Sequence, residues 1–447
     1  MIDDEGASVL LGFRAENVRS FRDPVEISLL ATALAQPAAV RRVRWRAGGR
    51  PISVLPAAGV FGANATGKSN LLRAMRDMRL HVLQSFRFGN PTGGIVRRPY
   101  LLDPSSRLAP SRFEVDIVLG GVRYEYGFVL DDTRILEEWA YRYPHGRPAQ
   151  LFHRRGDAVD LGSVERAKSR VVVELLRPNA LFLSTAASAN HATLLPLYAW
   201  FEQNLVLAEA DSRPVRQALT AQLMEDPGTR DRVLAFLTAA DLGVTGVQQI
   251  EPDPVTRERM QRAVRIILGQ EEEPDPSAEG LPSASFGVMM THRGADSDVA
   301  MNIDDESLGT LVWFGLAGPV LTAIADGTVL LADELDASLH PALVAELVRL
   351  FQDPATNPHH AQLIFNSHDA ALLGEPGVAS PLGRDQVWFV EKSNDGGSRL
   401  YGLSDLAPRK EEAIGRRYLA GRYGAVPILS RQQLAAAVSP APEGPAR

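Results

Sequence analysis

The hydrophobic pattern near the start of the chain predicts short strands followed by a helix. Strands are predicted over residues 10–18 and 25–30, and an apolar stretch covers residues 52–61. This third strand is expected to begin after Pro56, because proline has no amide hydrogen to donate to a sheet. Residues 70–83 carry apolar side chains at helical spacing and predict a helix.

Between residues 112 and 153 the apolar residues recur with a period of two. Two such runs, at 113–119 and 122–130, flank Gly120-Gly121, which predicts a hairpin with a glycine turn. Residues 134–143 continue the pattern as a third strand. We expect an antiparallel meander, inserted after the first helix as a separate small sheet.

Residues 160–270 are expected to be mainly helical. Apolar residues recur at helical spacing in 192–207, 229–239 and 255–268. Residues 270–282 are rich in glutamate and proline and predict a polar loop.

From residue 284 onward, strands and helices alternate. The predicted elements are strands at 285–292 and 298–303, a helix at 311–325, a strand at 328–332, a helix at 341–351 and a strand at 361–365. One turn and one helix separate the last two strands, so they form a βαβ unit and are expected to lie side by side and parallel. Residues 439–447, rich in proline and alanine, predict a disordered tail.

Size and composition restrict the class of protein. A chain of 447 residues exceeds one ordinary core, so two or three structural units are expected. No apolar run reaches the ~18 residues of a membrane span, and the acidic N-terminus lacks the layout of a signal peptide. There are no cysteines, which excludes disulfides and thiolate zinc sites. These features favour the cytoplasm and no membrane partner.

The net charge of −7 disfavours nucleic-acid binding by the chain as a whole. Residues 41–46 are a local exception, since they contain four arginines around Trp45, and Arg50 follows. Such a cluster can grip a phosphate backbone and stack a base, but a solvated strand edge would look the same.

The most specific motif is a glycine-rich run that reads Gly62-Ala63-Asn64-Ala65-Thr66-Gly67-Lys68-Ser69 and fits G-x-x-x-x-G-K-[ST]. Only four lysines occur beside forty-three arginines, so a chance match is rare. Backbone amides of such a loop surround a phosphate, and the helix that follows adds its positive dipole end. Lys68 supplies a point charge for the β- and γ-phosphates, and the Ser69 hydroxyl is a ligand for Mg²⁺.

The strand predicted at 328–332 ends in Asp333 and Glu334. A buried parallel strand places ligands at its carboxyl end, so Asp333 is expected to hold Mg²⁺ through water. Glu334 is expected to orient and deprotonate the attacking water. A buried strand that merely ends in acids is the alternative, which Lys68 upstream makes less favourable.

Two further segments extend this site. His368 follows the next strand by one βαβ step, which places it beside Asp333 and within reach of a γ-phosphate. Ser307 and Gly309 precede an apolar helix, an anion-binding arrangement that an ordinary helix cap would share.

The order of these motifs resembles that of ABC-type ATPases, in particular the "AAA family ATPase" or "ATP-binding protein" group related to OLD-family and SMC-like ATPases. Members serve in bacterial abortive-infection and anti-phage systems such as Septu, PARIS and retron-associated modules. The segments that carry the resemblance are Asn17-Val18-Arg19-Ser20-Phe21, the phosphate loop through Asn70, 306–310, 331–341, 366–369 and 418–427.

The resemblance implies an α/β P-loop NTPase fold of ABC type with an antiparallel β insertion and a helical insertion. The implied division is a first half of the ATPase head at 1–90, the β insertion at 91–158, a helical lid or arm at 159–283, the second half of the head at 284–438, and the tail at 439–447. It also implies ATP and Mg²⁺ as cofactors, with catalysis by Glu334, Lys68 and His368. The nucleotide-binding set is Gly62, Asn64, Ala65, Thr66, Gly67, Lys68, Ser69, Asn70, Ser307 and Gly309, and the metal ligands are Ser69 and Asp333.

By the same resemblance, two heads clamp two ATP molecules, and Ser307 and Gly309 of one copy cap the γ-phosphate bound by the other. Asp336, in the turn after Glu334, is expected to report across that interface. The chain departs from the family pattern in two places: it carries Ser-Leu-Gly-Thr where transporters carry Leu-Ser-Gly-Gly-Gln, and residues 100–105 contain no glutamine loop.

The first functional hypothesis is a dimeric or higher homo-oligomeric ATPase switch that gates an effector, such as a nuclease encoded nearby, in phage defence. The second is an SMC-like repair or recombination ATPase that acts directly on DNA. A transporter subunit is disfavoured by the Ser-Leu-Gly-Thr sequence, and a scaffold without turnover by the intact Asp333–Glu334 pair.

Overall fold

The computed structural model describes residues 8–36, 39–46, 48–162, 164–209, 212–249, 288–374, 380–409 and 412–427, with isolated positions at 254–265 and 430–435. The helix predicted at 255–268 lies largely outside the described residues. The loop predicted at 270–282 and the tail at 439–447 lie wholly outside them.

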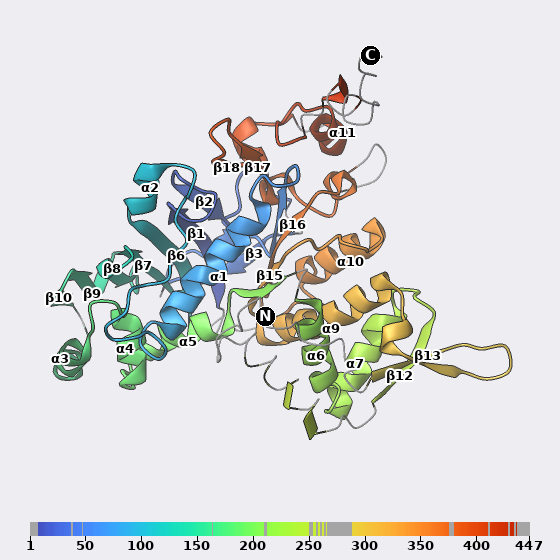
Figure 1. Ribbon diagram of the computed structural model, residues 1–447, viewed down its shortest axis with the longest axis horizontal. Helices are drawn as coiled ribbons and strands as arrows, with labels where there is room; N and C mark the ends of the chain where they lie inside the picture. The colour runs from blue at the N-terminus through green and yellow to red at the C-terminus, as the bar shows by residue number, and fades with distance from the viewer. Residues whose placement is uncertain are drawn as a thin grey trace, which may run out of the picture.

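A six-stranded sheet forms the centre of the molecule (Figure 1). In spatial order its strands are β11 (Val206–Ala208), β15 (Val329–Ala332), β16 (Gln362–Ser367), β5 (Ala57–Phe61), β17 (Val387–Lys392) and β18 (Ser398–Gly402). The first five are parallel, and β18 is antiparallel to β17. The predicted βαβ unit is confirmed, because β15 and β16 are parallel neighbours joined through α10 (Pro341–Gln352).

Both faces of this sheet are buried, and alternate residues belong to different cores. Val329 and Leu331 of β15 face one hydrophobic cluster, and Leu330 and Ala332 face the other. A strand with two buried faces must be apolar at every position, which explains the uninterrupted apolar runs in the sequence. The first cluster includes α1 (Lys68–Gln84), and the second includes α9 (Leu308–Asp326).

A seven-stranded antiparallel sheet packs on the far side of α1. Its spatial order is β10 (Ala158–Leu161), β9 (Ala149–Arg155), β8 (Ile135–Arg142), β7 (Val122–Leu130), β6 (Ser111–Leu119), β1 (Val9–Glu16) and β2 (Val25–Ser28). The predicted hairpin is confirmed, with Leu119 opposite Val122 and both turn glycines at positive φ. The prediction of a separate small sheet is wrong: β6 pairs with β1 along seven registered residue pairs, so the meander extends the N-terminal sheet.

The remaining elements lie around these two sheets. The helices are α2 (Pro104–Leu108), α3 (Arg166–Leu175), α4 (Phe182–Ser188), α5 (Leu195–Gln203), α6 (Arg213–Leu223), α7 (Pro227–Thr238) and α11 (Ile414–Leu419). A three-stranded sheet contains β12 (Val244–Gln249), β13 (Val288–His292) and β14 (Val299–Asn302). A two-stranded sheet pairs β3 (Arg41–Val43) with β4 (Ile52–Val54).

One sequence prediction in the helical middle is wrong, and one strand there was not predicted. The helix predicted at 192–207 ends at Gln203, and residues 206–208 form β11 beside β15. Residues 244–249 form β12, although 160–270 was predicted to be mainly helical. Each of these strands is short and pairs with a strand that lies far away in the sequence. A pattern read within a short stretch of sequence does not detect such a partner, so the helical spacing of the apolar residues predicts a helix instead.

Residues 41–43 of the arginine cluster form β3, in which Arg41 is buried and Arg42 is exposed, and residues 44–46 follow the strand. Arg46 stacks on Trp45 with its guanidinium carbon 4.8 Å from the ring centroid. The indole of Trp45 also donates a hydrogen bond to the carbonyl of Arg50 at 3.2 Å. An intramolecular arginine therefore already occupies a face of the proposed stacking surface.

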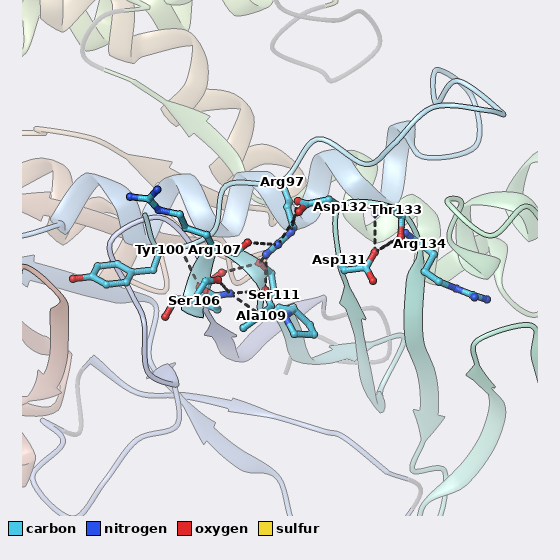
Figure 2. A network of polar contacts seen from close by, with 12 residues as sticks. Arg97, Tyr100, Ser106, Arg107, Ala109, Ser111, Asp131, Asp132, Thr133 and Arg134 are labelled. Atoms are coloured by element: carbon cyan, nitrogen blue, oxygen red, sulfur yellow. Dashed lines mark hydrogen bonds and ion pairs between the residues drawn. The ribbon is translucent and has the colours of Figure 1, made fainter. Parts of the chain in front are cut away.

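The segment between α1 and β6 is held by one buried arginine, Arg97 (Figure 2). Its guanidinium pairs with Asp132 at 2.7 Å and donates to the carbonyls of Ala109 and Arg107, each at 2.7 Å. Within this segment, Tyr100 donates its hydroxyl to the carbonyl of Asp395 at 2.7 Å. Residues 100–105, whose sequence contains no glutamine loop, are thus tied to the β17–β18 turn.

Among the described residues, α9 is the one helix long and apolar enough to cross a membrane by length and composition. Most of its residues pack inside the protein against α6, α7 and β15. A buried core helix has the same composition, so this feature is explained by packing.

Candidate functional site

The glycine-rich run forms a loop between β5 and α1. The strand begins directly after Pro56, as predicted, and the helix begins at Lys68, two residues earlier than predicted. Gly67 has φ +109°, and a Cβ there would lie 2.3 Å from the Ser398 hydroxyl and 2.5 Å from the Ser20 hydroxyl. Only glycine fits this turn, which lets successive amides point into the loop.

Lys68 lies across this loop. Its ammonium donates to the carbonyl of Gly62 at 2.8 Å and to the carbonyl of Ala63 at 3.0 Å. Burial lowers the pKa of Lys68, whereas the carboxylates of Asp336, Glu334 and Asp333 oppose that shift. The two halves of the predicted site are therefore close enough to interact electrostatically.

The N-terminal segment 17–21 supports the loop from outside. Asn70 donates its side-chain amide to the Ser20 hydroxyl at 2.9 Å, and Arg19 forms a two-pronged ion pair with Asp77 of α1 at 2.6 and 2.8 Å. From the opposite side, the Ser398 hydroxyl donates to the carbonyl of Thr66 at 2.5 Å. Segments far apart in the chain thus fix the phosphate loop, as pre-organised binding requires.

Asp333 and Glu334 follow β15, as predicted. Asp333 is buried, and Glu334 is exposed and has a positive φ of 52°. A positive φ is uncommon outside glycine and indicates a backbone that its surroundings hold in place. The turn directs adjacent carboxylates to different environments.

Asn366, at the end of β16, joins the two halves and was missed by the sequence analysis. Its buried amide donates to Asp333 Oδ1 at 2.5 Å and to the Ser69 hydroxyl at 3.3 Å. Its carbonyl oxygen accepts from the backbone amide of Glu334. The sequence signals were a polar residue at the tip of an apolar strand and its place in the segment 366–369, which carries the family resemblance.

Arg73 of α1 was also missed. Its guanidinium donates to Glu209 at 2.7 Å and lies 3.6 Å from Asp333 Oδ2. Glu209 follows β11 and also accepts from Arg76 at 2.6 Å. The sequence did not predict that Glu209 lies near Asp333, because β11, which places it there, was predicted as helix.

His368 lies where it was predicted, beside the turn that follows Glu334. Its imidazole Nδ1 is 3.5 Å from Asp336 Oδ2, and its backbone amide donates to the same oxygen at 3.3 Å. The His368 side chain is 59% exposed, so it faces solvent at the site.

A single cavity of about 470 Å³ collects these groups. It is lined by Asn64, Ala65, Thr66, Gly67, Lys68, Ser69, Asn70, Arg73, Glu334, Asn366, Ser367 and His368. Lys68 and Glu334 therefore face the same space. Gly62 and Asp333 lie behind its wall, where each contacts a residue of the lining.

Ser307 and Gly309 lie elsewhere in the chain's own fold. The Ser307 hydroxyl caps α9 by accepting from the amide of Thr310 at 3.2 Å. A Cβ on Gly309 would lie 3.0 Å from the carbonyl of Ser338, so glycine allows the helix to approach the turn after Asp336. Neither residue lines the 470 Å³ cavity of the described chain.

The oxygen atoms at the site fit a hard cation. Ser69 Oγ and Asp333 Oδ1 both accept from the side-chain nitrogen of Asn366, so the two oxygens are held near each other. No group of three or more His, Asp or Glu side chains suited to a metal occurs among the described residues. Mg²⁺ at such a site takes its other ligands from phosphate oxygens and water, as it does in nucleotide complexes.

The parallel sheet, the loop after β5 and the acids after β15 define a P-loop NTPase fold of the ABC type. The chain belongs to the family described as "AAA domain, putative AbiEii toxin, Type IV TA system", whose profile matches residues 57–374. No curated protein gives a significant match.

Solved structures of SMC heads are similar over most of the chain. The SMC head domain from Thermotoga maritima is 12% identical, with 88% of this chain and 98% of that one covered and a TM-score of 0.37. An SMC head bound to the C-terminal winged-helix domain of ScpA is 14% identical, with 89% and 99% covered and a TM-score of 0.41. A Pyrococcus furiosus SMC head, bound to the C-terminal domain of ScpA, is 12% identical, with 90% and 98% covered and a TM-score of 0.37. Likenesses at these TM-scores support no statement about function.

Proposed function

We propose that the protein binds and hydrolyses ATP with Mg²⁺ in the cavity between the phosphate loop and β15. The observation that carries this proposal is that Lys68, Ser69 and Glu334 line one space of about 470 Å³, large enough for a nucleotide's phosphates. The opposite charges of Lys68 and the acids beside it match a bound metal–phosphate complex.

The chain's residues divide the reaction among them. Lys68 and the amides of the loop bind the β- and γ-phosphates, and Ser69 and Asp333 hold the metal, which neutralises developing charge on the phosphates. Glu334 accepts a proton from the attacking water. Asn366 orients the Asp333 carboxylate and fixes the backbone of Glu334 through its hydrogen bonds. His368 lines the cavity with its side chain exposed to solvent, and its imidazole can donate to the γ-phosphate.

The proposed active form is a homodimer or larger assembly in which Ser307 and Gly309 of one copy cap the γ-phosphate held by the other. The exposed position of Ser307 at the start of a 19-residue helix supports this, because an uncovered helix N-terminus attracts anions. Hydrolysis would remove the phosphate that joins the copies, which makes the assembly a switch.

We further propose that this switch acts in the cytoplasm and gates an effector, such as a nuclease encoded nearby, in phage defence. The family description, which names a putative AbiEii toxin and a type IV TA system, supports a defence role. The test compares plating of phage on cells that carry the wild-type gene with its neighbours and on cells that carry Lys68→Ala. Equal plating on the two would contradict the defence role without touching the ATPase proposal.

The SMC-like alternative, direct action on DNA, has a specific observation in its favour, since Arg42 and Arg44 are exposed on the β3–β4 edge. Phosphate release measured with and without double-stranded DNA distinguishes the two. Stimulation by DNA that is lost in Arg42→Gln/Arg44→Gln would favour the alternative, and an unchanged rate would favour the effector-gating switch.

A further inference from the structure

A second, smaller cavity lies on the other side of Glu334. It has a volume of about 150 Å³ and is lined by Arg213 and Arg216 of α6, by Leu308 and Val312 of α9, and by Glu334 and the turn that follows. Glu334 lines this cavity and the 470 Å³ cavity, so it forms a wall between them.

Arg216 is a buried cation that forms no ion pair with another described residue. It is 5% exposed, and its Nε makes no hydrogen bond. Burial lowers the pKa of Arg216 to about 10, with the charge of Arg213 acting in the same direction and Asp333 opposing it. An uncompensated buried charge is unfavourable, and a carboxylate that enters the cavity would offset that penalty.

The Glu334 carboxylate is available for this role. The Glu334 backbone is fixed by the bond from its amide to Asn366, whereas in the described chain its carboxylate accepts no hydrogen bond and forms no ion pair. Rotation about side-chain torsions takes an exposed glutamate from one direction to another within nanoseconds. A fixed backbone between two cavities therefore gives the carboxylate two places to lie.

We propose that the cavity of Arg213 and Arg216 is an anion site for the carboxylate of Glu334, which it holds away from the phosphates until a nucleotide is bound. Arg216 is then a positioning residue that acts through Glu334. Other charged groups around Glu334 are Lys68 and Arg73 of α1, Asp333 and Asp336 of its own turn, and His368 after β16. This inference rests on the proposed ATPase function.

The first test is a double-mutant cycle on thermal unfolding of the full chain without nucleotide. Arg216→Met fills the cavity with an apolar side chain of similar length, and Glu334→Gln removes the charge. We expect Glu334→Gln to lower Tm by about 2 °C more in the wild-type background than in Arg216→Met. The exposed Arg232→Gln on α7 is the control for loss of one positive charge, and it should be additive with Glu334→Gln. Additive shifts for Arg216→Met would overturn the proposal.

The second test is the basal ATPase rate. If Arg216 retains Glu334 in the resting state, Arg216→Met raises kcat about two- to fivefold and leaves KM for ATP unchanged. A merely structural arginine would lower kcat instead, and that result overturns the proposal. Should Arg216→Met fail to fold, the half-buried Arg213→Gln is expected to change both measurements in the same directions with smaller amplitude.

The outcomes separate this inference from the proposed function. A wild-type chain without ATPase activity would refute the function, whereas the unfolding cycle still reports on the proposed interaction between Arg216 and Glu334. Inorganic phosphate is the probe for a different occupant. A ligand present in large excess over its Kd raises the Tm of the protein that binds it. If excess phosphate raises the Tm of Lys68→Ala but not of Lys68→Ala/Arg216→Met, and the cycle is additive, the cavity binds phosphate and the proposal is wrong.

Discussion

At the scale of single residues, Asn366 connects the two halves of the nucleotide site. Its side-chain nitrogen donates to the proposed metal ligands Asp333 and Ser69, and its side-chain oxygen accepts from the backbone amide of the proposed base, Glu334. Groups that orient metal ligands contribute to catalysis without touching the substrate, so the site depends on more residues than its motifs contain.

Removing this amide should weaken the metal site while leaving the fold intact. Asn366→Ala is expected to reduce kcat about 10- to 100-fold and to raise the Mg²⁺ concentration needed for half-maximal rate. Steady-state phosphate release over a Mg²⁺ titration measures both. Asn357→Ala removes another buried amide, one bonded to the carbonyls of Phe351 and Ala361, and controls for lost stability. A wild-type Mg²⁺ dependence in Asn366→Ala would show that the bridge has no part in catalysis.

Residues that belong to recognisable motifs could be predicted from the sequence, and residues outside those motifs could not. Lys68 and Ser69 belong to the phosphate loop, and Glu334 belongs to the acidic turn after β15. All three line one cavity, as these motifs predict. Arg73 and Glu209 meet only because β11 lies beside β15, and β11 is a three-residue strand inside a helical pattern. Spacing along one chain carries no information about such a pairing.

At the scale of elements, close packing of α6 on α9 positions the Ser307 end of α9 and the cavity lined by Arg213 and Arg216. Thr220 of α6 donates its hydroxyl to the carbonyl of Phe314 at 2.9 Å and accepts from the amide of Gly318 at 3.0 Å. A Cβ at Gly318 would lie 2.7 Å from that hydroxyl and 3.0 Å from the Thr220 amide. The two helices approach each other through this glycine.

A methyl group at Gly318 should therefore separate the helices. Gly318→Ala is expected to lower the free energy of unfolding by about 1–3 kcal/mol, because an overpacked contact against backbone cannot relax. Gly315→Ala, on the same helix, meets its nearest atom at 3.5 Å and gains helix propensity, so it should be neutral or stabilising by about 0.5–1 kcal/mol. Urea unfolding of the two variants gives the comparison. Equal midpoints would contradict this account of the α6–α9 contact.

The element pattern also shows where sequence periodicity is sufficient. Three strands of the central sheet, β5, β15 and β16, were predicted because two buried faces require apolar residues at every position. The strand β11 was predicted as helix, and β17 and β18 were not predicted. The pairing of the β6–β8 meander with β1 was not predicted, because apolar and polar residues alternate in the same way in a strand with one partner and in a strand with two. Partner choice depends on tertiary contacts that one strand's sequence does not record.

At the scale of the whole molecule, the Ser307 end of α9 lies outside the 470 Å³ cavity of the same chain. The proposed dimer brings the Ser307 end of one copy onto the cavity of the other. Ser307→Asp keeps a residue that caps helices well but adds a negative charge where the γ-phosphate would lie. Ser307→Asn is its neutral, isosteric control and caps equally well.

We expect Ser307→Asp to reduce ATP hydrolysis at least about tenfold and to abolish ATP-dependent dimers in light scattering, because like charges brought together are costly. ATP binding to the isolated copy should persist in both variants, since Ser307 lies outside the cavity. Equal activity and equal dimer content in Ser307→Asp and Ser307→Asn would contradict the proposed assembly.

The proposed function requires that one cavity holds a triphosphate through Lys68 and cleaves it with Glu334. The most direct measurement is ATP affinity and phosphate release for wild type, Glu334→Gln and Lys68→Ala in Mg²⁺ buffer and in EDTA. We predict that Glu334→Gln binds ATP as tightly as wild type, hydrolyses it about 10²- to 10⁴-fold more slowly and accumulates the dimer, and that Lys68→Ala loses binding. Hydrolysis by Glu334→Gln at the wild-type rate, or undiminished ATP binding by Lys68→Ala, would contradict the claim.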